Sequence, residues 1–204
     1  MFKIDPKTLI VIAAGLAAGF ITANIALNNL DEQEVLQLGE LPDTKTSVTH
    51  LPEINLPDIL GDKRNITEWY GKPLIVNFWA TWCAPCLREM PLLQLTHETA
   101  GEDGPLVIGI AADRTEDVKS FIAEYGYTYP ILIGQQEAFD LAEQFGFDFL
   151  GLPITIFTTA DGEILRIHTG ELHAEQLEAY LEIYMHLGMG HMHIDVARER
   201  MEAI

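Results

Sequence analysis

Two short apolar runs stand out in the middle of the chain, Leu74–Ala80 (LIVNFWA) and Leu106–Ala112 (LVIGIAA). Runs of this length that are rich in β-branched and aromatic residues are typical of strands buried on both faces of a sheet. A helical pattern follows each run, over residues 84–99 and 115–125, and Thr115 is a candidate N-cap of the second helix. The pattern therefore predicts alternating strands and helices.

The rest of the pattern completes a layered α/β domain. Residues 50–60 contain two prolines, which predicts an irregular edge strand, and residues 66–70 are predicted to form a helical turn. The later expected elements are a short extended piece at Pro130–Ile133, a helix at Glu137–Phe145, a hairpin of Ile154–Thr159 with Glu163–Thr169, and a helix at His173–Leu187. Alternation followed by a hairpin and a closing helix predicts a sheet with helices on both faces.

The N-terminus predicts a membrane anchor. Lys3 and Lys7 precede the almost purely apolar run Leu9–Leu27, and acidic residues follow it. About twenty apolar residues suffice to cross a bilayer, and this charge asymmetry keeps the N-terminus in the cytoplasm. No Ala-x-Ala site closes the run, which favours an uncleaved anchor over a cleaved signal peptide; a buried core helix is a third reading.

Composition divides the chain into four parts: a membrane anchor at 1–30, an acidic linker at 31–49, a folded domain at 50–187 and a Met/His-containing tail at 188–204. The linker lacks aromatic residues and any sustained period, as tethers do. The formal charge of −19 argues against nucleic-acid binding, because few cations are present to neutralise phosphates.

The chain has two cysteines, Cys83 and Cys86, both in the stretch WATWCAPC. A structural zinc site needs four ligands, whereas the chain has no second cysteine pair and no histidine near Cys83 in the sequence. A static disulfide that closes so short a loop removes little entropy from the unfolded state. The pair therefore favours redox chemistry over a metal site or a structural crosslink.

The position of Cys83 supports this interpretation. A buried strand ends just before Cys83 and a helix starts at or just after it, so the helix N-terminus favours the thiolate. In such a Cys-x-x-Cys the thiol pKa falls from about 8.5 to between about 3.5 and 7.5. We expect Cys83 to be the exposed nucleophile and Cys86, one turn further on, to be the more buried resolving thiol.

Two longer motifs resemble one protein family. VNFWATWCAPCLREMP (Val76–Pro91) and GLPITIFTTADGEI (Gly151–Ile164) are similar to the membrane-tethered TlpA/ResA/CcmG-type thiol:disulfide oxidoreductases of the bacterial periplasm. The resemblance spans about residues 50–185 and implies a thioredoxin-like fold, with a central mixed sheet, behind a single transmembrane helix. It also implies a reductase with no cofactor other than its disulfide. An inner-membrane electron transporter would keep it reduced, and its substrates would be apocytochrome c or copper-site cysteines.

The resemblance assigns further residues. Pro153 would be a cis-proline facing the disulfide, with the backbone of Leu152 and Pro153 contacting an extended substrate. Glu89 matches the acidic residue that these proteins place near the cysteines, and its position one turn after Cys86 agrees. It would tune the thiol pKa and move a proton during exchange, unless it is an exposed helix acid. The expected substrate-binding residues are Trp82, Ala84, Pro85, Leu152 and Pro153.

Neighbouring positions refine this resemblance. Thioredoxins carry a buried acid six residues before the first cysteine, where this chain has Asn77, so Glu89 is the better candidate for proton transfer. Pro91 matches the family's helix proline and should kink or interrupt the helix. Trp79 fits core packing best.

The stretch Met185–His193 (MHLGMGHMH) holds three methionines and three histidines. Thioether and imidazole groups suit copper, although a fraying helix end with a disordered tail, or a docking segment, would also explain it. An alternative function follows, in which a copper-handling assembly protein uses the CxxC and this tail. A thiol peroxidase is discounted because Ala80 stands where its threonine is needed, and a peptide-binding module would require unreactive cysteines.

Overall fold

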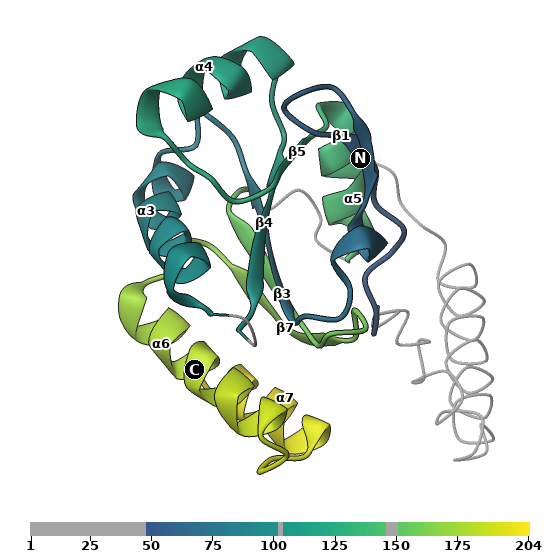
Figure 1. The fold of residues 1–204 in the computed structure, drawn as a ribbon, viewed down its shortest axis with the longest axis vertical. Helices are drawn as coiled ribbons and strands as arrows, with labels where there is room; N and C mark the ends of the chain where they lie inside the picture. The colour runs from purple at the N-terminus through teal and green to yellow at the C-terminus, as the bar shows by residue number, and fades with distance from the viewer. Residues whose placement is uncertain (1–47, 102–103, 146–150) are drawn as a thin grey trace, which may run out of the picture. The chain divides into compact units, whose positions relative to one another are not determined.

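A five-stranded sheet forms the centre of the computed structural model, which describes residues 48–101, 104–145 and 151–204 (Figure 1). The strand order is β5-β4-β3-β6-β7. The strands are β3 (Leu74–Trp79), β4 (Leu106–Ala111), β5 (Ile131–Ile133), β6 (Ile154–Thr158) and β7 (Ile164–Thr169). β3, β4 and β5 run parallel, β6 is antiparallel to β3, and β7 is antiparallel to β6. The predicted mixed sheet is confirmed.

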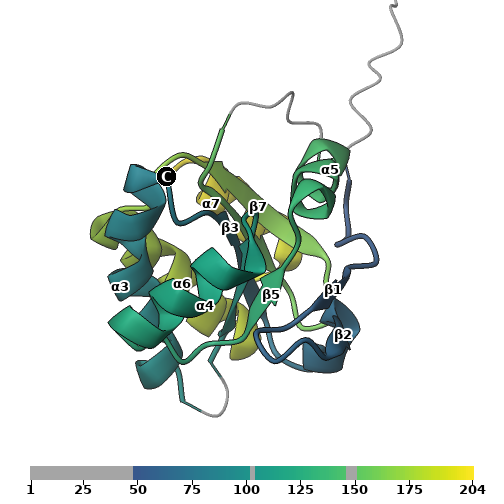
Figure 2. The ribbon, with the colours of Figure 1, turned by 90° about the horizontal axis from the view of Figure 1, so that it is seen from above.

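Two apolar cores lie on the two faces of this sheet. The helices are α3 (Ala84–Thr99), α4 (Thr115–Tyr125), α5 (Gln136–Gln144), α6 (Ala174–Gly188) and α7 (Ile194–Glu202). Successive residues of a strand point to opposite faces, so Ile75 and Trp79 join the core under α3 and α6, while Val76 and Phe78 join the core under α5. Figure 2 shows α3 and α6 on one side of the sheet and α5 on the other.

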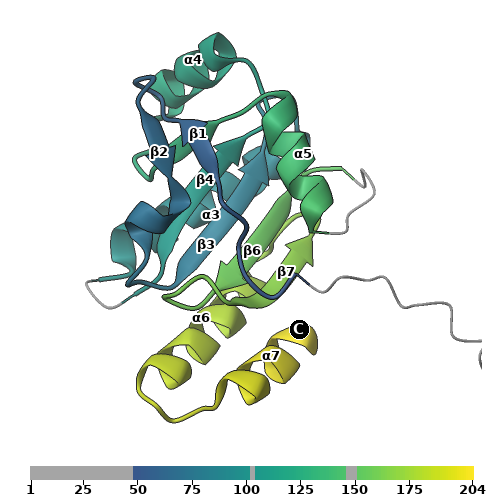
Figure 3. The same cartoon turned by 90° about the vertical axis from the view of Figure 1, so that its right-hand side faces the viewer.

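The segment before β3 differs from the prediction. Only Asn55–Pro57 of the predicted edge strand is regular, as β1, and it pairs with β2 (Lys63–Asn65) in a separate antiparallel sheet (Figure 3). Isolated bridges at His50 and Asp58 join the segment to the main sheet. Prolines lack the N–H that a longer ladder needs, which explains the short pairing. The predicted turn is the 3₁₀ helix η1 (Ile66–Trp69).

Two details of the helices correct the expectations. The N-cap of α4 is Arg114 and not Thr115, and no side chain caps this helix; acidic residues in its first turn complement the helix dipole instead. Helix α3 runs from Ala84 to Thr99, so Pro91 does not interrupt it, and the expected kink stays a prediction. The proline removes one donor within the helix, and the helix tolerates that loss because its buried face packs against the sheet.

The C-terminal residues are folded, so the reading of a disordered tail is wrong. Helix α7 follows α6 after a short turn (Figure 3), and Ala197 and Met201 are fully buried in the core shared with α3. The Arg198 guanidinium donates to the Ile164 carbonyl of β7 (3.1 Å) and pairs with the Glu163 carboxylate. The apolar residues of α7 recur at helical spacing, but polar and charged residues separate them.

The predicted anchor at 1–30 and almost all of the predicted linker lie outside the described residues. No helix among residues 48–101, 104–145 and 151–204 has the length and apolar character that a membrane span requires.

Candidate active site

The two cysteines lie where β3 leads into α3. Cys83 is the N-cap of α3, and its Sγ accepts a hydrogen bond from the Cys86 backbone N–H (3.3 Å). The two residues form a disulfide, with their Cα atoms 5.3 Å apart. The predicted helix start is therefore confirmed. A thiolate released at Cys83 on reduction faces the unpaired N–H groups of the first helical turn, which stabilise negative charge.

The disulfide is less accessible than expected. Cys83 is only 5% exposed and Cys86 is fully buried. The prediction that Cys83 is exposed is therefore wrong, whereas the prediction that Cys86 is the more buried of the two is confirmed. Both belong to the apolar core under α3, which explains their low exposure. The neighbouring Trp82 side chain is 65% exposed and Ala84 is also exposed, whereas Trp79 is fully buried as predicted.

Glu89 lies one helical turn after Cys86, on the buried face of α3. It is 1% exposed, so the reading of an exposed helix acid is wrong. The Asn77 side-chain amide donates to one carboxylate oxygen (2.7 Å), and the Leu172 backbone N–H donates to the other (2.6 Å). Asn77 also donates to the Thr155 hydroxyl (3.0 Å), its partner in the β3–β6 register. The carboxyl is therefore held directly by β3 and by the segment before α6, and indirectly by β6 through Asn77.

Burial raises the pKa of Glu89 to about 7, because an ionised carboxylate loses its hydration inside the protein. The hydrogen bonds from Leu172 and Asn77 oppose this rise, and the nearby Glu171 charge adds to it. Asn77 Oδ1 is buried without a partner among the described residues, so rotation of the amide gives a protonated Glu89 an acceptor. The site can thus accommodate both protonation states near neutral pH.

An exposed ion pair holds the segment that carries the Leu172 N–H. The Arg88 guanidinium donates to both carboxylate oxygens of Glu171, at 2.9 and 3.0 Å from Nε. Its own contribution to stability is modest, since solvent screens exposed pairs. Its geometric effect is to fix the connection from β7 to α6 against α3, beside Glu89.

The Leu152–Pro153 peptide bond is cis, as the resemblance implies. Because Ile154 pairs with Phe78, Pro153 lies at the end of β3 from which the cysteine loop departs. The Pro153 carbonyl accepts from the Gly170 N–H (2.9 Å), so it is already engaged within the sheet. Leu152 makes no hydrogen bond to another described residue. Of the two residues predicted to contact a substrate through their backbone, Leu152 is therefore the better candidate.

Asp113 is a residue that the sequence analysis missed. Its carboxylate accepts hydrogen bonds from the Thr81 N–H (3.0 Å) and the Thr81 hydroxyl (2.5 Å), two residues before Cys83. The parallel pairing of Trp79 with Ala111 brings the ends of β3 and β4 together and explains this contact. Its position directly after the apolar run Leu106–Ala112 could have identified it from the sequence. Asp113 is thus a positioning residue for the cysteine loop.

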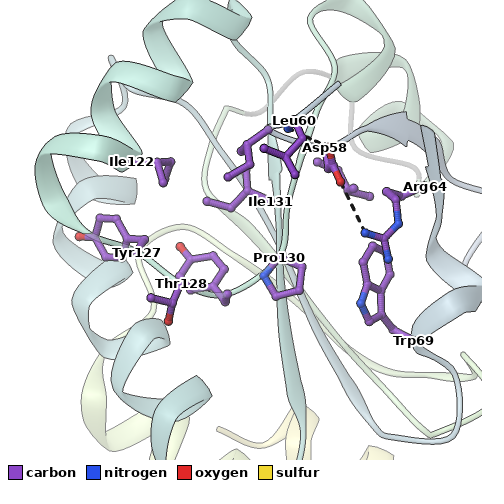
Figure 4. A pocket seen from close by; sticks show the side chains of 12 residues that line it. Asp58, Leu60, Arg64, Trp69, Ile122, Tyr127, Thr128, Pro130 and Ile131 are labelled. Atoms are coloured by element: carbon purple, nitrogen blue, oxygen red, sulfur yellow. Dashed lines mark hydrogen bonds and ion pairs between the residues drawn. The ribbon is translucent and has the colours of Figure 1, made fainter. Parts of the chain in front are cut away.

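Two other features lie apart from the disulfide. A cavity of about 270 Å³ between η1, β2 and the start of β5 holds the Asp58–Arg64 ion pair, with the guanidinium over the Trp69 ring (Figure 4). Within the described ranges, one group of three His, Asp or Glu residues brings its ligand atoms within 4.8 Å of one another: His50, Asp161 and Glu163. Neither feature includes a residue of the CxxC motif.

The chain is similar to known protein families and to individual relatives. The family model described as AhpC/TSA matches residues 48–167, more than half of the chain. The chain belongs to the AhpC/TSA family. The thiol-disulfide oxidoreductase ResA of Halalkalibacterium halodurans is 33% identical over 129 residues, which cover 63% of this chain and 71% of that protein.

Solved structures agree with this assignment. A secreted thiol-disulfide isomerase from Corynebacterium glutamicum is 26% identical with a TM-score of 0.58, covering 66% of this chain and 85% of its own. A thioredoxin family thiol:disulfide interchange protein from Chlorobium tepidum has a TM-score of 0.59 at 24% identity, covering 67% and 96%, and supports the fold. This member of the AhpC/TSA family is therefore a TlpA/ResA/CcmG-like thiol:disulfide oxidoreductase with a thioredoxin-like fold. Such an enzyme acts on disulfide-containing substrates together with a redox partner.

Proposed function

We propose that this oxidoreductase works as a reductase of specific protein disulfides, tethered to the inner membrane with its catalytic domain in the bacterial periplasm. One observation carries the exchange chemistry: a helix-capping disulfide is backed by a buried carboxyl whose pKa is raised to about 7. The reducing direction rests on the resemblance to the TlpA/ResA/CcmG-type proteins.

In the first step, the Cys83 thiolate attacks one sulfur of the substrate disulfide. A mixed disulfide forms, the substrate S–S bond breaks, and the departing substrate thiolate takes up a proton from solvent. Glu89 then accepts the Cys86 proton, and the Cys86 thiolate attacks Cys83 Sγ. The second substrate sulfur departs as a thiolate and takes up the proton that Glu89 held. The enzyme is left oxidised and the substrate has gained two electrons.

The surface around the disulfide suits an extended segment of a partner protein. Trp82 offers an exposed aromatic face, Ala84 is small and exposed, and Pro85 is half-buried beside them. The Leu152 backbone, which makes no hydrogen bond to another described residue, can hydrogen-bond to a strand of the partner, in the manner of β-strand addition. Pro153 is buried and shapes this edge through its backbone geometry.

A reductase in an oxidising compartment needs a source of electrons. We therefore expect an inner-membrane electron transporter to restore the Cys83–Cys86 dithiol by exchange. The expected substrates are apocytochrome c with a disulfide at its haem-binding cysteines, or a copper-site protein of oxidase assembly. No resident cofactor is required for either reaction, because the disulfide itself carries the electrons.

Trapping tests the reductase proposal. The Cys86→Ser variant, expressed as the full chain, should accumulate mixed disulfides through Cys83, and the trapped partners should be oxidised in cells that lack the enzyme. The matched control is Cys83→Ser, which should trap none. Recovery of no partner by Cys86→Ser, or of partners that become more reduced when the enzyme is absent, would overturn the reducing role.

The reduction potential tests the direction separately. Equilibration with glutathione or dithiothreitol buffers should give a value near the about −270 mV of thioredoxin. A value near the about −120 mV of DsbA would indicate an oxidant.

The tether has its own test. The apolar run Leu9–Leu27 behind Lys3 and Lys7 supports an uncleaved anchor. The full chain should stay in the membrane fraction after alkaline carbonate extraction, and a fusion of alkaline phosphatase after residue 47 should be active. Release into the periplasmic fraction, or an inactive fusion, would contradict the tether or its orientation.

A further inference from the structure

The turn between α6 and α7 gathers Met and His side chains that the exchange reaction does not use. The structure divides them into two sets. Met192 packs against the core, and the His193 imidazole lies 3.2 Å from the Asp195 carboxylate in the first turn of α7. His193 is itself exposed, but this contact engages its ring. Of the other four, His186 is half-buried and the rest are exposed: Met185, His186, Met189 and His191.

Two of these side chains face each other. The His191 N–H donates to the His186 carbonyl (2.9 Å), which closes the turn and places the two ring centroids 6.3 Å apart. Because a metal–imidazole nitrogen bond is about 2.0 Å long, one metal ion between two imidazoles holds the ring centres about 5 to 6 Å apart. The observed spacing therefore needs only a small side-chain rotation to bind one ion.

A thioether is available beside the two rings. Met189 lies three residues after His186 and two before His191, and residues three apart on a helix are neighbours. Its side chain is 61% exposed, so its rotatable bonds can bring the sulfur to the imidazoles without disturbing the core. Gly190 has φ +69°, a conformation that glycine adopts without strain, and this lets the chain turn back between the donors.

We propose that His186, Met189 and His191 form a Cu(I) site. Two neutral imidazoles and one thioether are a soft, uncharged donor set, which suits Cu(I) better than a hard divalent cation. The Glu182 carboxylate lies 3.8 Å from His186 Nε2 and adds a compensating negative charge. Helix α7 anchors the turn through buried Ala197 and Met201, so the site is held by the fold.

The site is separate from the disulfide. Helix α6 starts beside Leu172, next to Glu89, and its 15 residues span about 22 Å before the turn. Copper bound there leaves the CxxC thiols untouched. Both cysteines are oxidised in the disulfide, so copper binding by the oxidised protein does not depend on them.

Competition with a chromogenic chelator tests the site. Oxidised full chain in detergent micelles is titrated with the Cu(I)–bicinchoninate complex, with ascorbate and without oxygen. The wild type should remove one equivalent of Cu(I), His186→Ala with His191→Ala should weaken binding at least tenfold, and Met189→Leu should weaken it severalfold. X-ray absorption of the bound copper should show nitrogen and sulfur neighbours.

The control is His50→Ala, because His50 is an exposed histidine in the group with Asp161 and Glu163, whose carboxylates suit harder cations. This variant should bind Cu(I) as the wild type does. The proposal is overturned if the oxidised wild type takes no Cu(I) from bicinchoninate. It is also overturned if the double variant retains wild-type affinity, or if copper in the wild type has no sulfur neighbour. Disulfide reductase activity is read separately and should be equal in all these variants.

Discussion

The two faces of β3 are equally buried but very different in chemistry. The face toward α5 presents Leu74, Val76 and Phe78, all apolar. The face toward α3 presents Asn77 between apolar neighbours, and Asn77 hydrogen-bonds to a fully enclosed carboxyl. The α5 face shows that this strand can be buried with apolar side chains alone.

Burying a carboxyl costs free energy unless hydrogen bonds offset the loss of hydration. Two short hydrogen bonds reach Glu89, and its pKa is nevertheless raised to about 7. The α3 face therefore gives up stability at neutral pH and keeps a carboxyl that titrates near neutral pH behind the disulfide, as the proposed proton transfer requires. Perturbed groups of this kind concentrate at functional sites.

The largest expected effect falls on the apolar face. Phe78→Ala removes a fully buried ring that packs edge-on against Phe145 with centroids 6.1 Å apart. We expect a loss of about 3 to 5 kcal/mol in the free energy of unfolding, measured with denaturant. The midpoint of the Glu89 titration should not move. A shifted midpoint would show that the two faces are coupled.

The next effect is the pH dependence of stability. The folded pKa of Glu89 is raised from 4.5 to about 7, so the folded protein holds this proton more tightly than the unfolded chain. The resulting stability is present below pH 4.5 and is lost as the pH rises through about 7. The loss amounts to about 3 kcal/mol. Relative to wild type, Glu89→Gln should therefore gain about that much between pH 4 and pH 8 in denaturant unfolding of the oxidised protein.

Catalysis should respond to the same substitution. Glu89→Gln keeps the volume but cannot exchange a proton, and general acid–base catalysis contributes about a hundredfold or more. We expect disulfide reduction at pH 7 to slow about a hundredfold, and the step near pH 7 in the pH profile of thiol alkylation to disappear. The matched control is Glu98→Gln, an exposed glutamate on the same helix as Glu89, which should change the rate less than threefold. Equal effects of the two substitutions would make Glu89 a structural acid.

The smallest effect concerns the loop before Cys83. Asp113→Asn weakens two hydrogen bonds from Thr81 and should destabilise the protein by about 1 kcal/mol. Thr81→Val removes one of the two bonds and should cost less. Both should slow the attack of Cys83 on a disulfide severalfold, with the Glu89 midpoint unchanged. Loss of stability without any effect on Cys83 would restrict Asp113 to a structural role.

Helices and strands with continuous or periodic patterns could be predicted from the sequence. The bounds 84–99 and 115–125 of α3 and α4 agree with the prediction, and β3 and β4 end one residue earlier than expected. Local pattern suffices there because these strands are buried on both faces. Strand β1 and helix α7 depend on contacts with distant segments, through the Asp58–Leu132 bridge beside β1 and the hydrogen bond from Arg198 of α7 to Ile164, so their local patterns are weak.

In the candidate site, too, some features could be predicted from local sequence and others depend on distant contacts. The cysteines, Glu89 and the cis-proline could be assigned from motifs, but the burial of Glu89 requires Leu172 and Thr155, which come from elements more than sixty residues away. The link between Thr81 and Asp113 likewise depends on the parallel pairing of two strands. The sequence identifies these chemical groups, whereas the strand order determines which of them meet.

The most direct measurement is the titration of Glu89 itself. Carbon-13 resonances of glutamate side-chain carboxyls can be followed from pH 3 to pH 9 in the oxidised protein, with the Glu89 signal assigned by its loss in Glu89→Gln. A midpoint at about pH 7 is expected, well above the ordinary 4.5. A midpoint near 4.5 would contradict the account, because the Glu89 carboxylate would then be too weak a base to take up the proton of Cys86 near neutral pH.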